Sequence, residues 1–152
     1  LRPLMWGGGQ ERGLRPGTLP VHLIAGLGEA ARLCLANHPS RQQHNVAFKA
    51  RFLEALSPLN PVVTGSDAPT LDHAVSLRFA GLDSEAAMVA LKGVAALSNG
   101  SACTSASYTP SHVLLAMGWS AEEAQEALRF SWCHLTDDPD YSAMVACLER
   151  VI

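Results

Sequence analysis

Cys103 lies in a stretch of small and polar residues where a thiol could act as a nucleophile. Residues 98–109 read Ser-Asn-Gly-Ser-Ala-Cys-Thr-Ser-Ala-Ser-Tyr-Thr, without the apolar spacing of a helix or strand. Such a segment buries little apolar surface, so we expect a mobile, exposed loop. An exposed thiolate is the reactive form of cysteine. An incidental surface cysteine is the alternative, and no Lys, Arg or His adjoins Cys103 in the sequence.

Arg129 is a candidate for binding a carboxylate. It lies in Leu-Arg-Phe-Ser-Trp, an alternating segment that predicts a strand over 128–132, with Arg129 and Ser131 on one face. The planar fork of arginine binds carboxylates through two parallel hydrogen bonds. The plainer alternative is an arginine on the solvated face of a sheet, and this pattern alone leaves both open.

Thr18 ends a glycine-rich opening segment that could bind an anion. Residues 1–17 contain five glycines, and Thr18 is placed to cap a helix that we expect over about 19–37. Backbone amides and a hydroxyl at a helix N-terminus favour a phosphate. The segment matches neither GxxxxGK[ST] nor GxGxxG, however, and a tight turn would need the same glycines.

The remaining cysteines and the histidines predict no metal site. Cysteines 34, 103, 133 and 147 form no CxxC pair, and the six histidines show no HExxH spacing. Cys34 and Cys147 fall in apolar helical patterns and are expected to be packed, whereas Cys133 is ambiguous. Reduced thiols in the cytoplasm are the expectation from this cysteine usage.

Composition and charge exclude several classes of protein. The 152 residues are 48% hydrophobic and 16% charged, which suits one compact soluble domain. No apolar stretch approaches the roughly 20 residues of a membrane-spanning helix, and no secretory signal is recognisable. The net charge is −3 with scattered Arg and Lys, so we expect no direct nucleic-acid partner. The chain opens on Leu1 without an initiator Met, which suggests a fragment or a processed product.

The periodicity predicts an α+β fold, a small mostly antiparallel sheet covered by helices. A break at Asn37-His38-Pro39 is expected between the first two helices, and a Ser120-Ala-Glu-Glu capping box opens a later one. The expected helices are 19–37, 40–57, 86–94 after a cap at Asp83 or Ser84, 110–118, 121–127, and a last one from Asp137 or Asp138 to Ile152. The expected strands are 61–65, 73–79, 95–97 and 128–132.

Several motifs together resemble the pyridoxal-phosphate-dependent cysteine desulfurases of the class V aminotransferase superfamily. The segment 98–105 is similar to the cysteine loop of the subgroup with a long mobile loop, the housekeeping iron–sulfur and nitrogenase-cofactor enzymes. The segment 7–20 resembles the family's glycine-rich stretch, with Pro16 where serine is usual. Leu128-Arg-Phe-Ser resembles its Ile-Arg-Phe-Ser strand, and 110–118 resembles the helix after the loop. These motifs occur in the family's order and span nearly the whole chain.

The resemblance implies specific roles for three residues. Pyridoxal phosphate would act as an electron sink on L-cysteine, and Cys103 would take the substrate sulfur as a persulfide while alanine is released. Arg129 would bind the substrate carboxylate. Thr18 would contact the cofactor phosphate of the opposite subunit, which implies a homodimer. The mobile loop would carry the persulfide to an acceptor protein.

The departures from the family pattern define which part of the enzyme this chain resembles. The family's cofactor lysine lies in a Ser-x-His-Lys segment that is absent here, and neither Lys49 nor Lys92 matches it. The resemblance therefore implies a C-terminal part of a fold-type I enzyme: residues 1–37 from the large domain and 38–152 as the small domain, with the cysteine loop at 98–109. Taken alone, such a chain is expected to be inactive and without covalently bound cofactor. Cys133-His134 also stands where relatives carry Gly-Arg.

Other functions stay open on the sequence alone. A selenocysteine lyase or another class V aminotransferase can dispense with a loop cysteine. A non-catalytic small domain that binds sulfur acceptors is a further alternative, motivated by the missing lysine segment. The acceptor also stays open, since iron–sulfur cluster assembly, tRNA thiolation and DNA phosphorothioation all draw on similar enzymes.

Overall fold

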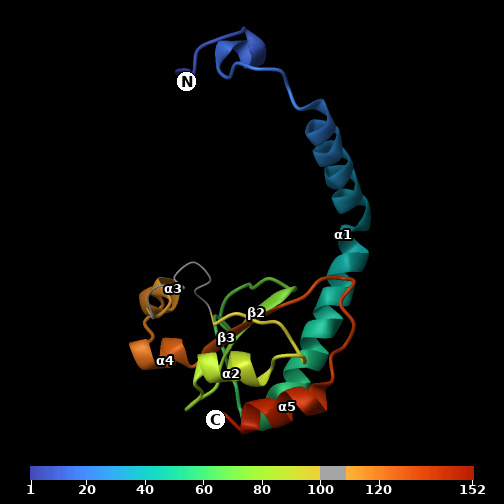
Figure 1. Cartoon of the computed structure of the whole chain (residues 1–152). Helices are drawn as coiled ribbons and strands as arrows, with labels where there is room; N and C mark the ends of the chain where they lie inside the picture. The colour runs from blue at the N-terminus through green and yellow to red at the C-terminus, as the bar shows by residue number, and fades with distance from the viewer. Residues whose placement is uncertain (100–108) are drawn as a thin grey trace. The chain divides into compact units, whose positions relative to one another are not determined.

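The computed structural model describes residues 1–99 and 109–152 (Figure 1). Cys103 therefore lies outside the described residues. The chain divides into two compact units, Leu1–Pro39 and Ser40–Ile152. The second unit holds a three-stranded antiparallel sheet with helices packed on it, so the predicted α+β class is confirmed.

The first unit contains the glycine-rich segment and the beginning of a long helix. A short 3-10 turn, η1 (Gln10–Gly13), is followed by α1 (Val21–Leu56). The prediction that Thr18 caps this helix is wrong. The Pro20 carbonyl accepts the Ile24 N–H at 3.1 Å, so Pro20 occupies the cap position, and Thr18 lies exposed before it.

The predicted break at Asn37-His38-Pro39 is also wrong, because α1 is helical through Pro39. Proline lacks one N–H donor and therefore removes one backbone hydrogen bond from a helix interior. The residues after Pro39 are mostly good helix formers, so the helix continues beyond the proline to Leu56.

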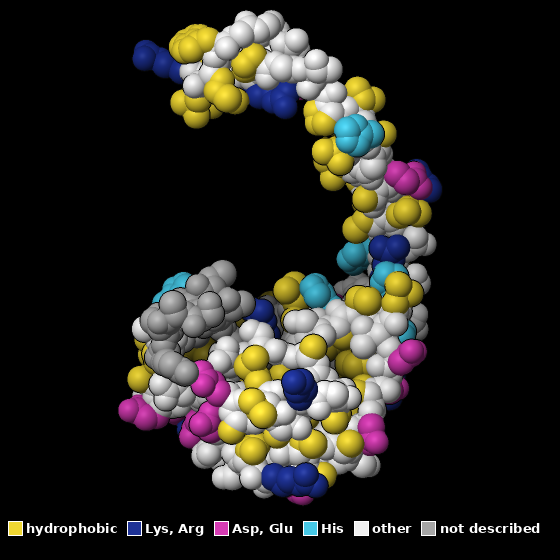
Figure 2. Space-filling model, in the orientation of Figure 1, with side chains coloured by type: hydrophobic (Ala, Val, Ile, Leu, Met, Phe, Trp, Pro, Cys, Tyr) yellow, Lys and Arg dark blue, Asp and Glu magenta, His cyan; other side chains and the backbone are white. Residues whose placement is uncertain are grey.

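The apolar side chains along the first part of α1 are exposed within their own unit. Val21, Ile24, Leu27 and Leu35 are all more than half exposed. Figure 2 shows hydrophobic side chains on the surface along the first part of α1. Cys34 is exposed as well, so the prediction that it is packed is wrong. A unit of this size buries too little surface to form a core of its own.

The sheet of the second unit has the order β1-β2-β3. The strands are β1 (Val62–Val63), β2 (Ala74–Arg78) and β3 (Ala127–Ser131), and both pairings are antiparallel. These positions confirm three of the four predicted strands. The apolar run at 95–97 forms no strand, and the next residue, Ser98, makes a single bridge to Arg129.

Short helices with clear caps surround the sheet. Helix α2 (Ser84–Ala90) starts at Asp83, whose side chain accepts two backbone N–H groups, and α3 (His112–Ala116) ends before Gly118, which has a φ of 92°. The predicted capping box is confirmed at α4 (Ala121–Gln125).

The cap of the last helix, α5 (Tyr141–Glu149), differs from the prediction. Asp140 caps it by accepting the Ala143 N–H at 2.9 Å, so the assignment to Asp137 or Asp138 is wrong. The Asp138 carboxylate instead accepts hydrogen bonds from Arg51 and from the Tyr141 hydroxyl. This ion pair joins α1 to the segment before α5.

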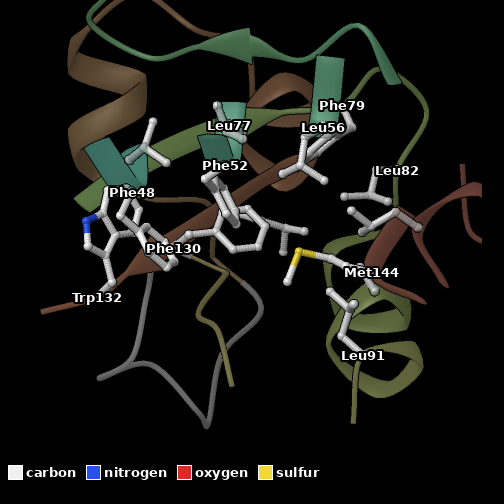
Figure 3. Packing of buried hydrophobic residues seen from close by; sticks show 14 residues of the cluster. Phe48, Phe52, Leu56, Leu77, Phe79, Leu82, Leu91, Phe130, Trp132 and Met144 are labelled. Carbon is white, nitrogen blue, oxygen red and sulfur yellow. The ribbon is translucent and has the colours of Figure 1, made fainter. Parts of the chain in front are cut away.

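An aromatic core joins α1 to one face of the sheet (Figure 3). Phe52 is 2% exposed, and its ring centroid lies 4.9 Å from that of Phe130 on β3 and 5.7 Å from that of Trp132. The other fully buried large side chains of this core lie in α1, in or directly after β2, directly after α2, in β3 and in α5: Leu56, Leu77, Phe79, Leu91, Leu128, Met144 and Leu148.

Replacing Phe52 by alanine tests this core. We expect Phe52→Ala to lower the free energy of unfolding by about 3–5 kcal/mol, because the lost ring leaves a cavity between α1 and β3. Val46→Ala, at a half-exposed position of the same helix, should change it by no more than about 0.5 kcal/mol. Urea unfolding followed by tryptophan fluorescence measures both, and equal effects would contradict the assignment of Phe52 to the core.

A network of ion pairs and hydrogen bonds links Arg78, the last residue of β2, to Glu123 and Glu126. The Arg78 guanidinium contacts Glu126 at 2.7 Å and Glu123 at 3.0 Å. The Gly81 N–H donates to the same Glu126 carboxylate at 2.8 Å. The Gly81 N–H and then Arg78 lower the pKa of Glu126 from its ordinary value of 4.5.

This network predicts a pH-dependent stability. A lowered pKa in the folded state means that Glu126 contributes stability above about pH 4.5 and that the contribution is lost as the pH falls through the lowered value. Glu126→Gln should therefore be less stable than the unchanged chain at pH 7, and the difference should shrink toward pH 3. Unfolding curves at a series of pH values measure this, and a difference independent of pH would contradict it.

Candidate active site around Arg129

The pleat of β3 places the Arg129 side chain on the face of the sheet opposite the aromatic core. Its neighbours Leu128 and Phe130 are buried, whereas Arg129 is exposed. The predicted alternation of this strand is thereby confirmed. Ser76 of β2 is the register partner of Arg129, so these two side chains are neighbours on the same face.

The backbone of Arg129 is held on its other side by Ser98. The Arg129 N–H donates to the Ser98 carbonyl at 2.7 Å, and the Ser98 N–H donates to the Arg129 carbonyl at 3.2 Å. Ser98 is the first residue of the polar segment that contains Cys103. The residue expected to bind a carboxylate and the beginning of the expected cysteine loop therefore lie side by side.

A pocket of about 320 Å³ lies beside Arg129. It is built from the outer face of the sheet, from the segment that joins β1 to β2, and from one side chain of α1. Thr64 contributes a buried hydroxyl that has no hydrogen-bond partner among the described residues. The described lining consists of Lys49, Val63, Thr64, Pro69, Thr70, Leu71, Ala74, Val75, Ser76 and Arg129.

The charges of the pocket favour an anion. Its described lining includes two cations, Lys49 and Arg129, and no carboxylate. Arg51 and Arg78 form ion pairs with acidic residues of the fold, whereas no such pair involves Arg129 within the described ranges. A guanidinium without an internal partner is available to a carboxylate from outside the chain.

Lys49 fastens one wall of this pocket. Its Nζ donates to the Thr70 hydroxyl at 2.9 Å and to the Leu71 carbonyl at 3.0 Å. Gln42, also on α1, donates to the Asp72 carboxylate at 3.0 Å. The sequence predicts no role for Lys49. Its hydrogen-bond acceptors lie more than twenty residues away, and no local sequence pattern indicates such contacts.

The three predicted site residues are not all placed by the structure. Arg129 lines the pocket, Thr18 belongs to the Leu1–Pro39 unit, and Cys103 lies outside the described residues.

The other cysteines differ in exposure. Cys147 is partly buried against the core, in accord with the prediction. Cys133 is exposed beyond the end of β3. The Leu135 N–H, 3.4 Å from its sulfur, and the Thr136 hydroxyl at 3.7 Å lower the pKa of the Cys133 thiol.

The described residues do not by themselves fit pyridoxal phosphate. A site for this cofactor needs a lysine for the Schiff base and an acidic or basic partner for the pyridine nitrogen. The one lysine of the described lining is Lys49, and its amine already donates to two groups of the wall. Lys92, the other lysine, is exposed and is not part of that lining.

Two features are absent from residues 1–99 and 109–152. None of their helices has the length and apolar character needed to traverse a bilayer. No group of three or more His, Cys, Asp or Glu side chains among them is arranged to hold a metal ion.

The chain is similar to known cysteine desulfurases. It is 39% identical over 150 residues to the cysteine desulfurase IscS of Pseudomonas putida, an alignment that covers 97% of this chain and 37% of that protein. The chain thus spans a little over a third of the length of this relative. This similarity confirms the resemblance drawn from the motifs.

Solved structures agree with this similarity. A NifS-like protein from Rickettsia africae superposes with a TM-score of 0.79 at 25% identity, covering 99% of this chain and 39% of that one. DndA from Streptomyces lividans superposes with a TM-score of 0.66 at 44% identity, covering 87% of this chain and 37% of that one. The sequence profile described as aminotransferase class-V matches residues 6–143, which is most of the sequence. The chain belongs to the class-V aminotransferase family.

Proposed function

We propose that this chain supplies the sulfur-accepting thiol, Cys103, and the carboxylate-binding guanidinium, Arg129, of a cysteine desulfurase acting on L-cysteine. The observation that carries the proposal is the pocket that Arg129 lines. The backbone of Arg129 is hydrogen-bonded to Ser98, the residue at which the cysteine segment starts. Cys103 follows Ser98 by five residues, a length of chain that spans at most ~18 Å. This reach is compatible with a thiol that approaches a substrate bound at Arg129.

The proposed reaction transfers one sulfur atom from the substrate to Cys103. The Cys103 thiolate attacks the sulfur of L-cysteine, a new S–S bond forms and the substrate C–S bond breaks. The electron pair of the broken bond stays with the substrate carbon, which takes up a proton, so that alanine leaves and Cys103 carries a persulfide. Arg129 holds the substrate carboxylate during this transfer.

When bound, pyridoxal phosphate would supply the electron sink that such a bond cleavage needs. The Schiff-base lysine is proposed to lie in a part of the protein outside this chain, which alone would then be inactive. Thr18 is proposed to contact the cofactor phosphate across a homodimer. Its exposed hydroxyl follows Gly17, whose N–H is held by the Gln10 side chain at 3.2 Å.

The domain assignment and the sulfur acceptor are proposals of the same kind. We assign residues 1–37 to the large domain and 38–152 to the small domain that carries the cysteine segment. An acceptor protein would take the persulfide sulfur. A reducing compartment such as the cytoplasm keeps Cys103 available as a thiol.

Substitution of Cys103 tests the proposed sulfur carrier. In the intact protein with its cofactor, Cys103→Ser should abolish persulfide formation from L-cysteine, because the hydroxyl cannot take up the sulfur. The matched control is Cys133→Ser, at another exposed cysteine, which should keep the activity of the unchanged protein. Alanine release and a gain in mass of one sulfur atom measure the reaction. Persulfide formation that survives in Cys103→Ser would reject the assignment.

Substitution of Arg129 tests the carboxylate anchor. Arg129→Ala should raise the KM for L-cysteine roughly 10- to 100-fold, because a hydrogen bond to a charged group contributes about 1.5–3 kcal/mol. Arg51→Ala is the control, since Arg51 pairs with Asp138 and is absent from the described lining of the pocket. Steady-state kinetics with L-cysteine measure both variants, and an unchanged KM in Arg129→Ala would contradict the role.

A further inference from the structure

We propose that Lys49 is a positioning residue for the carboxylate pocket: it holds the segment between β1 and β2 in the place that lets Arg129 bind the carboxylate of L-cysteine or L-alanine. This inference rests on the proposed function and adds a residue from α1 to the site.

The contacts of Lys49 bear directly on the pocket. Its ammonium donates to the Thr70 hydroxyl at 2.9 Å and to the Leu71 carbonyl at 3.0 Å. All three residues belong to the lining that also contains Arg129. One side chain of α1 thus fixes two wall residues that come from a different part of the fold.

These hydrogen bonds matter for the pocket wall because the segment between β1 and β2, which forms the wall, buries little of its own surface. Strand β1 has two residues, and residues 66–71 of the following segment are all exposed. Regions with few buried contacts open at low free-energy cost. The hydrogen bonds from Lys49 therefore hold in place a pocket wall that packing against the core does not hold.

A second hydrogen bond from α1 to the same segment serves as a control for the contacts of Lys49. Gln42, seven residues before Lys49 on α1, donates to the Asp72 carboxylate at 3.0 Å. Neither Gln42 nor Asp72 belongs to the described lining of the pocket. Loss of the Gln42 bond should therefore loosen the same segment without removing a contact to the wall.

The charge of Lys49 acts in the same direction as its hydrogen bonds. The ammonium lines a pocket that contains the Arg129 guanidinium and has no carboxylate in its described lining. Two cations at one pocket raise the local positive potential and attract an anionic group. A variant that keeps the charge and the donors should therefore keep the function of the residue.

The test is a titration of the 152-residue chain with L-alanine, the proposed product, followed by the NMR resonances of the Arg129 Nε–H and of the Thr70 and Leu71 amides. This readout needs neither cofactor nor turnover. We expect L-alanine to shift these resonances in the unchanged chain. Lys49→Met should weaken this binding about 5- to 10-fold, as expected from the loss of one charged, hydrogen-bonded side chain. Lys49→Arg and Gln42→Leu should stay within about twofold of the unchanged chain.

The outcomes separate this inference from the proposed function. Equal binding by Lys49→Met and the unchanged chain would overturn the inference, as would an equal loss in Gln42→Leu, which would indicate general loosening of the segment. Absence of an Arg129 shift in the unchanged chain would overturn it too. If Lys49→Met weakens binding but the intact protein forms no persulfide on Cys103, the proposed function fails and the role of Lys49 in the pocket stands.

Discussion

The alternation of β3 is the constraint on which the candidate site depends. Leu128 and Phe130 are buried in the core that includes residues of α1 and α5. Because side chains alternate along the strand, this burial directs Arg129 to the opposite face of the sheet. A slip of one residue in the register would bury the guanidinium and expose the two apolar side chains. An unpaired buried charge and lost apolar burial are both costly. The core thus determines where the cation lies.

The same strand connects the core to the cysteine segment. Phe130 and Trp132 contact Phe52 on α1, while the backbone of Arg129 pairs with Ser98. The packing that stabilises the domain therefore also fixes the point from which the segment containing Cys103 starts. The sheet edge thereby places Ser98, where this segment starts, beside Arg129, which lies 31 positions later in the sequence.

Local patterns predicted much of the fold, and contacts between distant segments could not be predicted. The alternation at 128–132 and the capping box at Ser120 are local signals, and both are confirmed. The break at Pro39 was wrong because one missing donor did not end the helix, and Cys34 was wrongly predicted to be packed because its unit has no core. The tie from Lys49 to Thr70 depends on the tertiary fold, so no local pattern contains it.

We propose that sulfur from L-cysteine reaches Cys103 at a site whose carboxylate anchor is Arg129. The most direct measurement follows an isotopically labelled sulfur atom from L-cysteine into the intact protein, with peptide mapping under non-reducing conditions. The account predicts the label on the peptide that contains Cys103 and its release by a reducing thiol. Label on the peptide containing Cys133, or no labelled peptide at all, would contradict it.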